Sequence, residues 1–214
     1  MKNSRNDFKG YRGIFRVNIL RSILNRLIYN DEYSTIDSNL SDSNVGARKG
    51  RNICDNIFVA NEVINFRTNR CSIVRHRKCY DALWLQECIN DLYDSGLKND
   101  KLPLLFLENQ NARVAVKSSQ GISKRADIKN IVMQGSVWGS LFCTTTMDKL
   151  GQYCYENPEM LYDYKGVAVP PLCMVDDILS IQKCQDAKKI NATINAFIEI
   201  KKFTLSHKNA TGSR

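Results

Sequence analysis

The stretch that most constrains the fold is residues 173–181, in which two adjacent aspartates lie between two short apolar runs, Cys-Met-Val and Ile-Leu-Ser-Ile. Pro170-Pro171 comes before this stretch and Gln182-Lys183 comes after it. Each run therefore has the length and the boundaries of a buried strand. Two such runs in succession predict a β-hairpin that carries Asp176 and Asp177 between its strands.

The two aspartates are poor residues for a tight turn. A short hairpin turn normally selects Asn-Gly or Asp-Gly, for which positive φ costs little, and two adjacent carboxylates repel each other in a partly desolvated site. A divalent cation would neutralise the pair. Because strand side chains alternate in direction, one of the two would point directly at the metal, and we favour Asp176. An ordinary exposed Asp-Asp loop is the alternative interpretation.

Length and composition are those of a globular protein. A chain of 214 residues forms one domain, or two closely packed subdomains, with enough apolar sequence for a core. No apolar run approaches the length of a membrane span, and residues 1–6 lack the apolar stretch of a signal peptide. We therefore expect an intracellular protein, in the cytoplasm or the nucleus, without a membrane partner.

The eight cysteines are scattered along the chain, and no two of them form a Cys-x-x-Cys pair. Only His76 and His207 could join them in a zinc site, and neither histidine has ligand spacing. We therefore expect buried, reduced thiols.

The formal net charge of +9 is concentrated in the first part of the chain. Residues 1–80 contain 15 Lys and Arg against 7 Asp and Glu, whereas residues 81–214 are nearly neutral. This asymmetry favours a polyanionic partner that is contacted mainly through the N-terminal part. A solvated basic surface is the alternative.

Residues 44–51 form a basic stretch, Asn-Val-Gly-Ala-Arg-Lys-Gly-Arg. Its glycines let the backbone approach phosphates closely, and its Arg and Lys side chains supply charge and hydrogen-bond donors. The spacing of a nucleotide P-loop is absent. We predict a phosphate-contacting loop that leads into a helix near Ile53.

Apolar spacing predicts the other elements. Residues 14–28 are predicted to form a helix with a core face of Phe15, Ile19, Leu20, Ile23, Leu24, Leu27 and Ile28. Residues 30–44 are rich in Ser, Asn and Asp and are predicted to form a loop. Further predictions are a helix on Leu85, Cys88, Ile89 and Leu92, a strand at 113–117, a helix on Leu141, Met147 and Leu150, and an amphipathic helix on Ala187, Ile190, Ile194 and Phe197.

Five blocks occur in a fixed order: Tyr11-Arg12-Gly13-Ile14, Gly46-Ala47-Arg48-Lys49-Gly50-Arg51, Lys78-Cys79-Tyr80-Asp81, Met133-Gln134-Gly135-Ser136 and Val175-Asp176-Asp177. Together they cover nearly the whole chain and resemble the reverse transcriptase domain of non-LTR (LINE-type) retrotransposons. The resemblance implies an α/β (α+β) fold with right-hand polymerase fingers and palm, in which helices back an antiparallel palm sheet. It also implies RNA-directed DNA synthesis from an RNA template, a DNA primer, dNTPs and Mg²⁺.

The same resemblance implies an order of segments. Residues 1–70 correspond to a fingers-like basic segment, residues 71–205 to a palm-like catalytic segment, and residues 206–214 to a tail that we expect to be disordered. We expect no thumb in this chain.

The resemblance also implies roles for individual residues. Asp176 and Asp177 would be the catalytic and metal-binding carboxylates, which hold two Mg²⁺ ions about 4 Å apart at the primer hydroxyl and the leaving pyrophosphate. The expected substrate-binding residues are Arg12 at the triphosphate, Arg48 and Lys49 in the second basic block, Tyr80 at the sugar, and Gln134 and Gly135 against the template and nascent base pair. Tyr80 as a core residue and Gln134 as an ordinary loop residue are the structural alternatives.

One position departs from the family in a way that matters chemically. The family carries a metal-binding aspartate six residues before the position of Asp81, and this chain has Arg75 there. A cation in this place repels Mg²⁺ and could form an ion pair with Asp176. We therefore expect impaired catalysis and weakened Mg²⁺ binding. The alternative function is a non-catalytic remnant that binds nucleic acid.

Overall fold

The computed structural model describes residues 14–66, 72–75, 83–98, 100–110, 112–128, 132–158, 161–175, 177–181, 188, 192 and 194–197, with the backbone alone at 72–75. The helices are α1 (Ile19–Ser38), α2 (Ile53–Phe66), α4 (Leu85–Asp94), α5 (Lys101–Asn109) and α6 (Val137–Glu156). The strands are β1 (Ser72–Arg75), β2 (Ala112–Val114), β3 (Lys117–Ser118), β4 (Gly121–Ile122), β5 (Ala126–Ile128), β6 (Tyr162–Tyr164), β7 (Val167–Val169), β8 (Leu172–Met174) and β9 (Asp177–Ser180).

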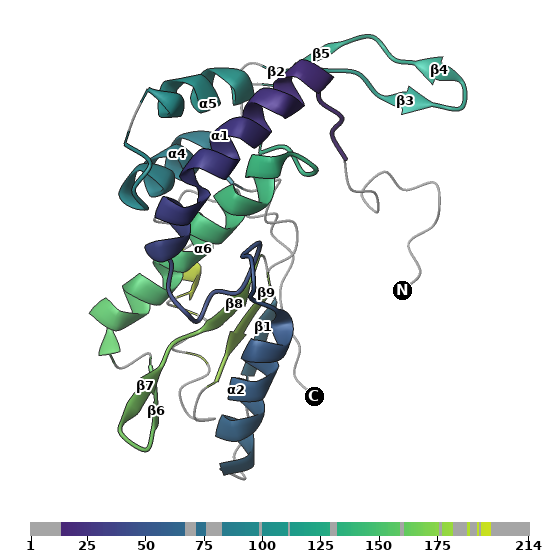
Figure 1. The fold of residues 1–214 in the computed structure, drawn as a ribbon. Helices are drawn as coiled ribbons and strands as arrows, with labels where there is room; N and C mark the ends of the chain where they lie inside the picture. Colours follow the sequence, from purple (N-terminus) through teal and green to yellow (C-terminus); the bar gives the residue numbers. More distant parts are fainter. Residues whose placement is uncertain are drawn as a thin grey trace.

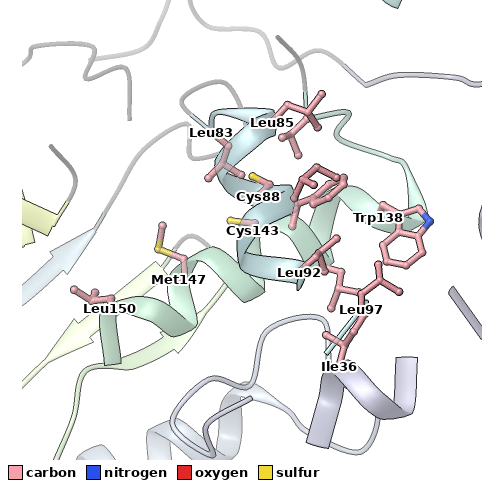
Figure 2. Packing of buried hydrophobic residues seen from close by; sticks show 14 of the residues in the cluster. Ile36, Leu83, Leu85, Cys88, Leu92, Leu97, Trp138, Cys143, Met147 and Leu150 are labelled. Carbon is pink, nitrogen blue, oxygen red and sulfur yellow. The ribbon is translucent and has the colours of Figure 1, made fainter. Parts of the chain in front are cut away.

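Helix α6 is the centre of the fold. Thirteen of its twenty residues are buried, which requires neighbours on nearly every side of the helix. It begins at Ser136, whose Oγ accepts a hydrogen bond of 3.2 Å from the Trp138 amide, a favourable N-terminal cap. Helices α1 and α4 lie beside its first half, and α5 packs against α4 (Figure 1). Figure 2 shows Leu92 of α4 and Ile36 of α1 beside Trp138 of α6 in one apolar core.

The second layer is a three-stranded antiparallel sheet in the order β1-β9-β8. Helix α2 lies beside this sheet (Figure 1), and a smaller apolar cluster joins them. That cluster contains Ala60 and Val63 of α2, Tyr162 of β6, Leu172 of β8 and Ile181. The mixed α/β class with small antiparallel sheets agrees with the sequence-based expectation, and the predicted hairpin at 173–181 is confirmed as β8 and β9.

The core face predicted for α1 is wrong. Ile19 and Leu20 are both 73% exposed, and Leu27 is 62% exposed. Of the seven residues assigned to that face, only Ile28 is buried. The helix instead turns Asn25, Ile28, Tyr33 and Ile36 inward. Periodicity identified the helix correctly, but it could not tell which face meets α6.

The loop predicted at residues 30–44 is also wrong in its first half, because α1 continues to Ser38. The polar residues there have partners that a helix can supply. The Tyr33 hydroxyl donates a hydrogen bond of 3.1 Å to Asp37, one turn further on. Such (i, i+4) contacts stabilise a helix in a stretch of weak helix formers.

The cysteine environments differ. Cys88, Cys143, Cys154 and Cys173 are buried free thiols, as expected, whereas Cys54 is exposed. Burial raises the pKa of Cys154 to about 11 and that of Cys173 to about 12. Within the described ranges, no helix is both long and apolar enough to cross a lipid bilayer.

The raised thiol pKa values predict a loss of stability in alkali. An unfolded cysteine ionises near pH 8.5, and the folded chain keeps the protons of both thiols to a higher pH. Above the unfolded pKa, the free energy of unfolding should therefore fall by up to about 1.4 kcal/mol per pH unit for each thiol. Urea unfolding of the wild type and of Cys173→Ala at pH 8, 9 and 10 measures this slope. We expect a shallower slope in Cys173→Ala, and equal slopes would contradict the assignment.

Candidate functional site

The acidic hairpin has a two-residue turn. Met174 pairs with Asp177 in the antiparallel register of β8 and β9, and Val175 lies in the turn that follows β8. Val175 has a φ of 55°, which is a strained value for a β-branched residue. Asp177 is the first residue of β9, so this predicted carboxylate lies in the strand. Asp176 itself lies outside the described residues.

Strand β1 brings Arg75 to the same place. β1 pairs with β9 in antiparallel register, and Arg75 is directly opposite Asp177. Residues that are directly opposite in such a pair are the closest cross-strand neighbours. The chain thus places a basic residue against the one predicted metal ligand that the structure describes.

The basic loop at 44–51 packs against this hairpin. The Val45 amide donates to the Cys173 carbonyl at 3.0 Å, and the Cys173 amide donates to the Ser43 carbonyl at 2.8 Å. Gly46 lies directly against the turn: a Cβ added to it would stand 2.2 Å from the Val175 amide nitrogen. Only glycine allows this approach, which brings the basic loop next to the acidic turn.

Helix α6 forms contacts with both the basic loop and the hairpin turn. The Asn44 side-chain amide donates to the Thr144 carbonyl at 2.8 Å, and the Thr144 hydroxyl donates to the Gly46 carbonyl at 2.9 Å. The Cys143 thiol approaches the Val175 carbonyl at 3.5 Å. Asn44 and Thr144 were not among the predicted site residues. An asparagine just before a glycine-containing basic stretch is the sequence signal that could have indicated the anchor.

Thr144→Val should loosen the loop. The substitution keeps the shape of the side chain and leaves the Gly46 carbonyl without its donor, so we expect a loss of about 1–3 kcal/mol in the free energy of unfolding. Thr145→Val is the matched control, because the Thr145 hydroxyl donates only to the Leu141 and Phe142 carbonyls of its own helix. Chemical denaturation compares the two variants. An equal loss in both would show that the contact between loop and helix contributes nothing.

Arg48 was predicted to contact substrate, and the structure turns its guanidinium inward. The side chain is 4% exposed. Its Nε donates to Asp37 Oδ1 at 2.7 Å, and its Nη1 donates to the carbonyls of Ser41 at 2.6 Å and of Asn44 at 3.0 Å. Its Nη2 donates to the Asp37 carbonyl at 3.0 Å. In this arrangement Arg48 braces the loop.

Lys49 faces outward. Its backbone amide donates to the Tyr33 hydroxyl at 2.6 Å, and its Nζ lies 4.7 Å from the centroid of the Tyr33 ring, within the range of a cation–π contact. Burial raises the pKa of Tyr33. Arg51, at the end of the loop, is bonded to Asp42 on the surface. Lys49 is therefore the predicted substrate-binding cation of this loop that stays accessible to a phosphate.

The Gln-Gly loop lies beside the start of the described chain. The Gln134 carbonyl accepts a hydrogen bond of 2.9 Å from the Phe15 amide. Gly135 has a φ of 100°, and a Cβ there would lie 3.1 Å from the Phe15 carbonyl. An added Cβ on Gly135 would also lie 3.4 Å from Ile14 Cγ2, so the last residue of the first sequence block lies next to the Gln-Gly block. Arg12 lies outside the described residues.

A concave pocket adjoins the Gln-Gly loop. It is lined by Arg26 and Tyr29 of α1 and by Gly135, Ser136, Val137 and Ser140. Burial raises the pKa of Tyr29 above its ordinary value. The sequence reasoning missed Arg26 and Tyr29, because the prediction for α1 considered only its apolar positions. Their spacing of three residues on one helix face was the available signal.

The described residues do not complete a metal centre. No three His, Cys, Asp or Glu side chains gather into a possible metal site within the described part of the chain. Asp176, Asp81 and Tyr80 lie outside it. Asp177 is the remaining predicted ligand, and Arg75 is opposite to it. Two-metal centres need several oxygen ligands, and of the predicted ligands the described residues include Asp177.

No protein-family profile and no curated protein sequence matches the chain. Solved structures do match. Apo telomerase from Candida tropicalis has a TM-score of 0.54 at 14% identity, covering 85% of this chain and 35% of that chain. The same enzyme in complex with the TWJ fragment of telomeric RNA has a TM-score of 0.51 at 15% identity, covering 90% and 35%. A form truncated from the C-terminal domain has a TM-score of 0.52 at 14% identity, covering 88% and 42%.

These likenesses show the fold. The chain has a fold similar to part of telomerase, and it spans about a third of the length of the first two telomerases that it matches.

Proposed function

We propose that the chain is a reverse transcriptase domain of LINE type, with fingers and palm, that is impaired in nucleotidyl transfer by Arg75. The reaction of the unimpaired site is transfer from a dNTP to a primer 3′ hydroxyl on an RNA template. The observation that carries the proposal is the packing of Gly46 against the turn that precedes Asp177. It joins the basic loop to the acidic hairpin, as a polymerase requires of its triphosphate-binding and metal-binding parts.

The proposed roles follow from charge and position. Lys49 and Arg12 hold the triphosphate, Tyr80 limits the space near the sugar, and Gln134 and Gly135 lie against the template. The positive φ and the bare Cα of Gly135 suit a surface that a base pair approaches closely. Asp176 and Asp177 are the proposed metal ligands, with Mg²⁺ as the cofactor. The cation at position 75 weakens that metal site.

A specific observation also favours the second candidate, a non-catalytic protein that binds nucleic acid. Arg75 is opposite Asp177, and an arginine in this register position replaces part of the charge that a divalent cation would supply. The basic N-terminal half would then retain nucleic acid after catalysis is lost.

Primer extension on poly(rA)/oligo(dT) with Mg²⁺ distinguishes these functions. Wild type, Arg75→Asp and Arg75→Asp/Asp176→Ala are compared. We expect weak incorporation in wild type, a clear increase in Arg75→Asp, and none in the double variant. Incorporation that survives Asp176→Ala would reject the proposed metal site. No incorporation in any variant, with binding of the hybrid retained, would establish the non-catalytic function.

A further inference from the structure

Residues 112–128 form a two-stranded ribbon that leaves the body of the protein. β2 pairs with β5, and β3 pairs with β4 beyond them. Figure 1 shows β3 and β4 as the far end of this ribbon, on the opposite side of the molecule from the sheet β1-β9-β8. Every residue from 115 to 127 is exposed. Both faces of the ribbon therefore meet solvent, and we refer to residues 112–128 as the arm.

The arm is irregular at its middle. Arg113 is opposite Asp127, and Lys117 is opposite Ile122, so the pairing shifts by one residue between the two ladders. The Ser123 hydroxyl fills the gap, because it accepts a hydrogen bond of 2.9 Å from the Val116 amide and donates one of 2.9 Å to the Lys124 carbonyl. Such a bulge increases the twist of a ribbon.

The arm is strongly basic for its size. It contains four cations and one carboxylate, Asp127. Arg113 is paired with Asp127 at 3.1 Å, and both side chains are 71% exposed. Lys117, Lys124 and Arg125 form no ion pair with any residue that the structure describes. These three exposed cations, Lys117 on β3 and Lys124 and Arg125 between β4 and β5, constitute a polyanion-binding surface.

The arm also exposes apolar side chains. Val116 is 68% exposed and Ile122 is 73% exposed. An isolated two-stranded ribbon is only marginally stable in water, and these side chains have nothing in the described chain to cover them. Nucleic-acid-binding proteins that insert into a groove combine cations with small apolar wedges in this way.

The geometry points to the arm as a second nucleic-acid contact, which takes the groove and phosphates of a double helix through Lys117, Lys124 and Arg125. The major groove of B-form DNA, about 12 Å wide, admits a two-stranded ribbon. Binding of single strands relies on stacking against aromatic rings, and residues 112–128 contain none. A duplex is therefore the ligand that fits, and this contact is separate from the proposed polymerase site.

Salt dependence tests the contact. A fluorescent B-form DNA duplex is titrated with the full chain over a series of salt concentrations, for wild type and for Lys117→Gln/Lys124→Gln/Arg125→Gln. Loss of three phosphate contacts should reduce the slope of log affinity against log salt by about 2–3. The matched control replaces Lys98, Lys165 and Lys188, which are exposed outside the arm, with Gln. The control should change the slope by less than about 1.

Two results would overturn the inference: an unchanged slope in the arm variant, or an equal reduction in the control. A photoreactive benzophenone amino acid at Gln120, between β3 and β4, gives a second readout that does not depend on charge. We expect it to crosslink to the DNA duplex, whereas the same group at Lys165 does not; the absence of a crosslink from Gln120 would contradict the contact. Asp176→Ala should leave the salt slope unchanged, so failure of primer extension and failure of the arm are separate outcomes.

Discussion

Replacing Arg48 with alanine is expected to lower the free energy of unfolding by about 3–5 kcal/mol, the usual loss when one partner of a buried ion pair is removed. The guanidinium is almost fully enclosed and donates to Asp37 and to the carbonyls of Ser41 and Asn44. Without it, these acceptors keep their desolvation cost and lose their partner. The Asp37 side chain retains 30% exposure, so water can relieve part of that cost, and we expect a value near the lower end.

Arg51→Ala provides the comparison. Arg51 also pairs with an aspartate, Asp42, but that side chain is 84% exposed. Exposed pairs contribute about 0–1 kcal/mol, so the loss should be several times smaller than for Arg48. Urea denaturation measures both. If Arg48→Ala unfolded like the wild type and lost only affinity for triphosphate, the bracing role would be wrong and the substrate role correct.

Replacing Gly46 with alanine should have an effect of similar size, for a steric reason. The added Cβ would lie 2.2 Å from the Val175 amide nitrogen and 3.0 Å from the Val175 Cα. Because these are backbone atoms, no side-chain rotation can relieve the clash, and either the basic loop or the acidic turn must move. Overpacking of this kind costs about 3 kcal/mol.

Gly166→Ala is a control for the general cost of adding a methyl group to a glycine. Gly166 has a φ of 83° with nothing within 4 Å of an added Cβ, so alanine there pays only backbone strain, about 1 kcal/mol. Thermal unfolding of the two variants separates the effects. A loss in Gly46→Ala no larger than in Gly166→Ala would mean that the loop does not press against the hairpin in solution.

The hairpin was predictable because its signals are local. Two prolines precede it, and one short apolar run lies on each side of the two aspartates. The position of Asp177 in the strand was not predictable from these signals. It follows from the register of β8 and β9, which places Val175 in the turn and Asp177 in β9. One residue of register decides this, and apolar alternation alone does not fix it where the turn residues are atypical.

The direction of Arg48 shows a different limit. A basic residue in a glycine-containing loop resembles a phosphate ligand, but its partner Asp37 lies in a stretch whose composition predicts a loop. That stretch is the last part of α1, and only the folded chain brings the two together. Tertiary contacts override local propensity here.

The basic charge of the arm could not be seen in the charge totals used for the sequence-based prediction. Residues 81–214 are nearly neutral in sum, so the basic character of residues 112–128 does not appear in a count over halves. The strand predicted at 113–117 covers parts of β2 and β3, and its separation from the core follows from exposure on both faces. A window of about the length of one hairpin would have revealed the charge.

Manganese binding measured by electron paramagnetic resonance tests most directly whether the hairpin is a polymerase metal site disabled by Arg75. Mn²⁺ takes the same oxygen ligands as Mg²⁺. We predict weak binding in wild type, an affinity more than about tenfold higher in Arg75→Asp from the reversal of charge beside Asp177, and loss of that gain in Arg75→Asp/Asp176→Ala. An affinity that is the same in wild type and Arg75→Asp would contradict the account.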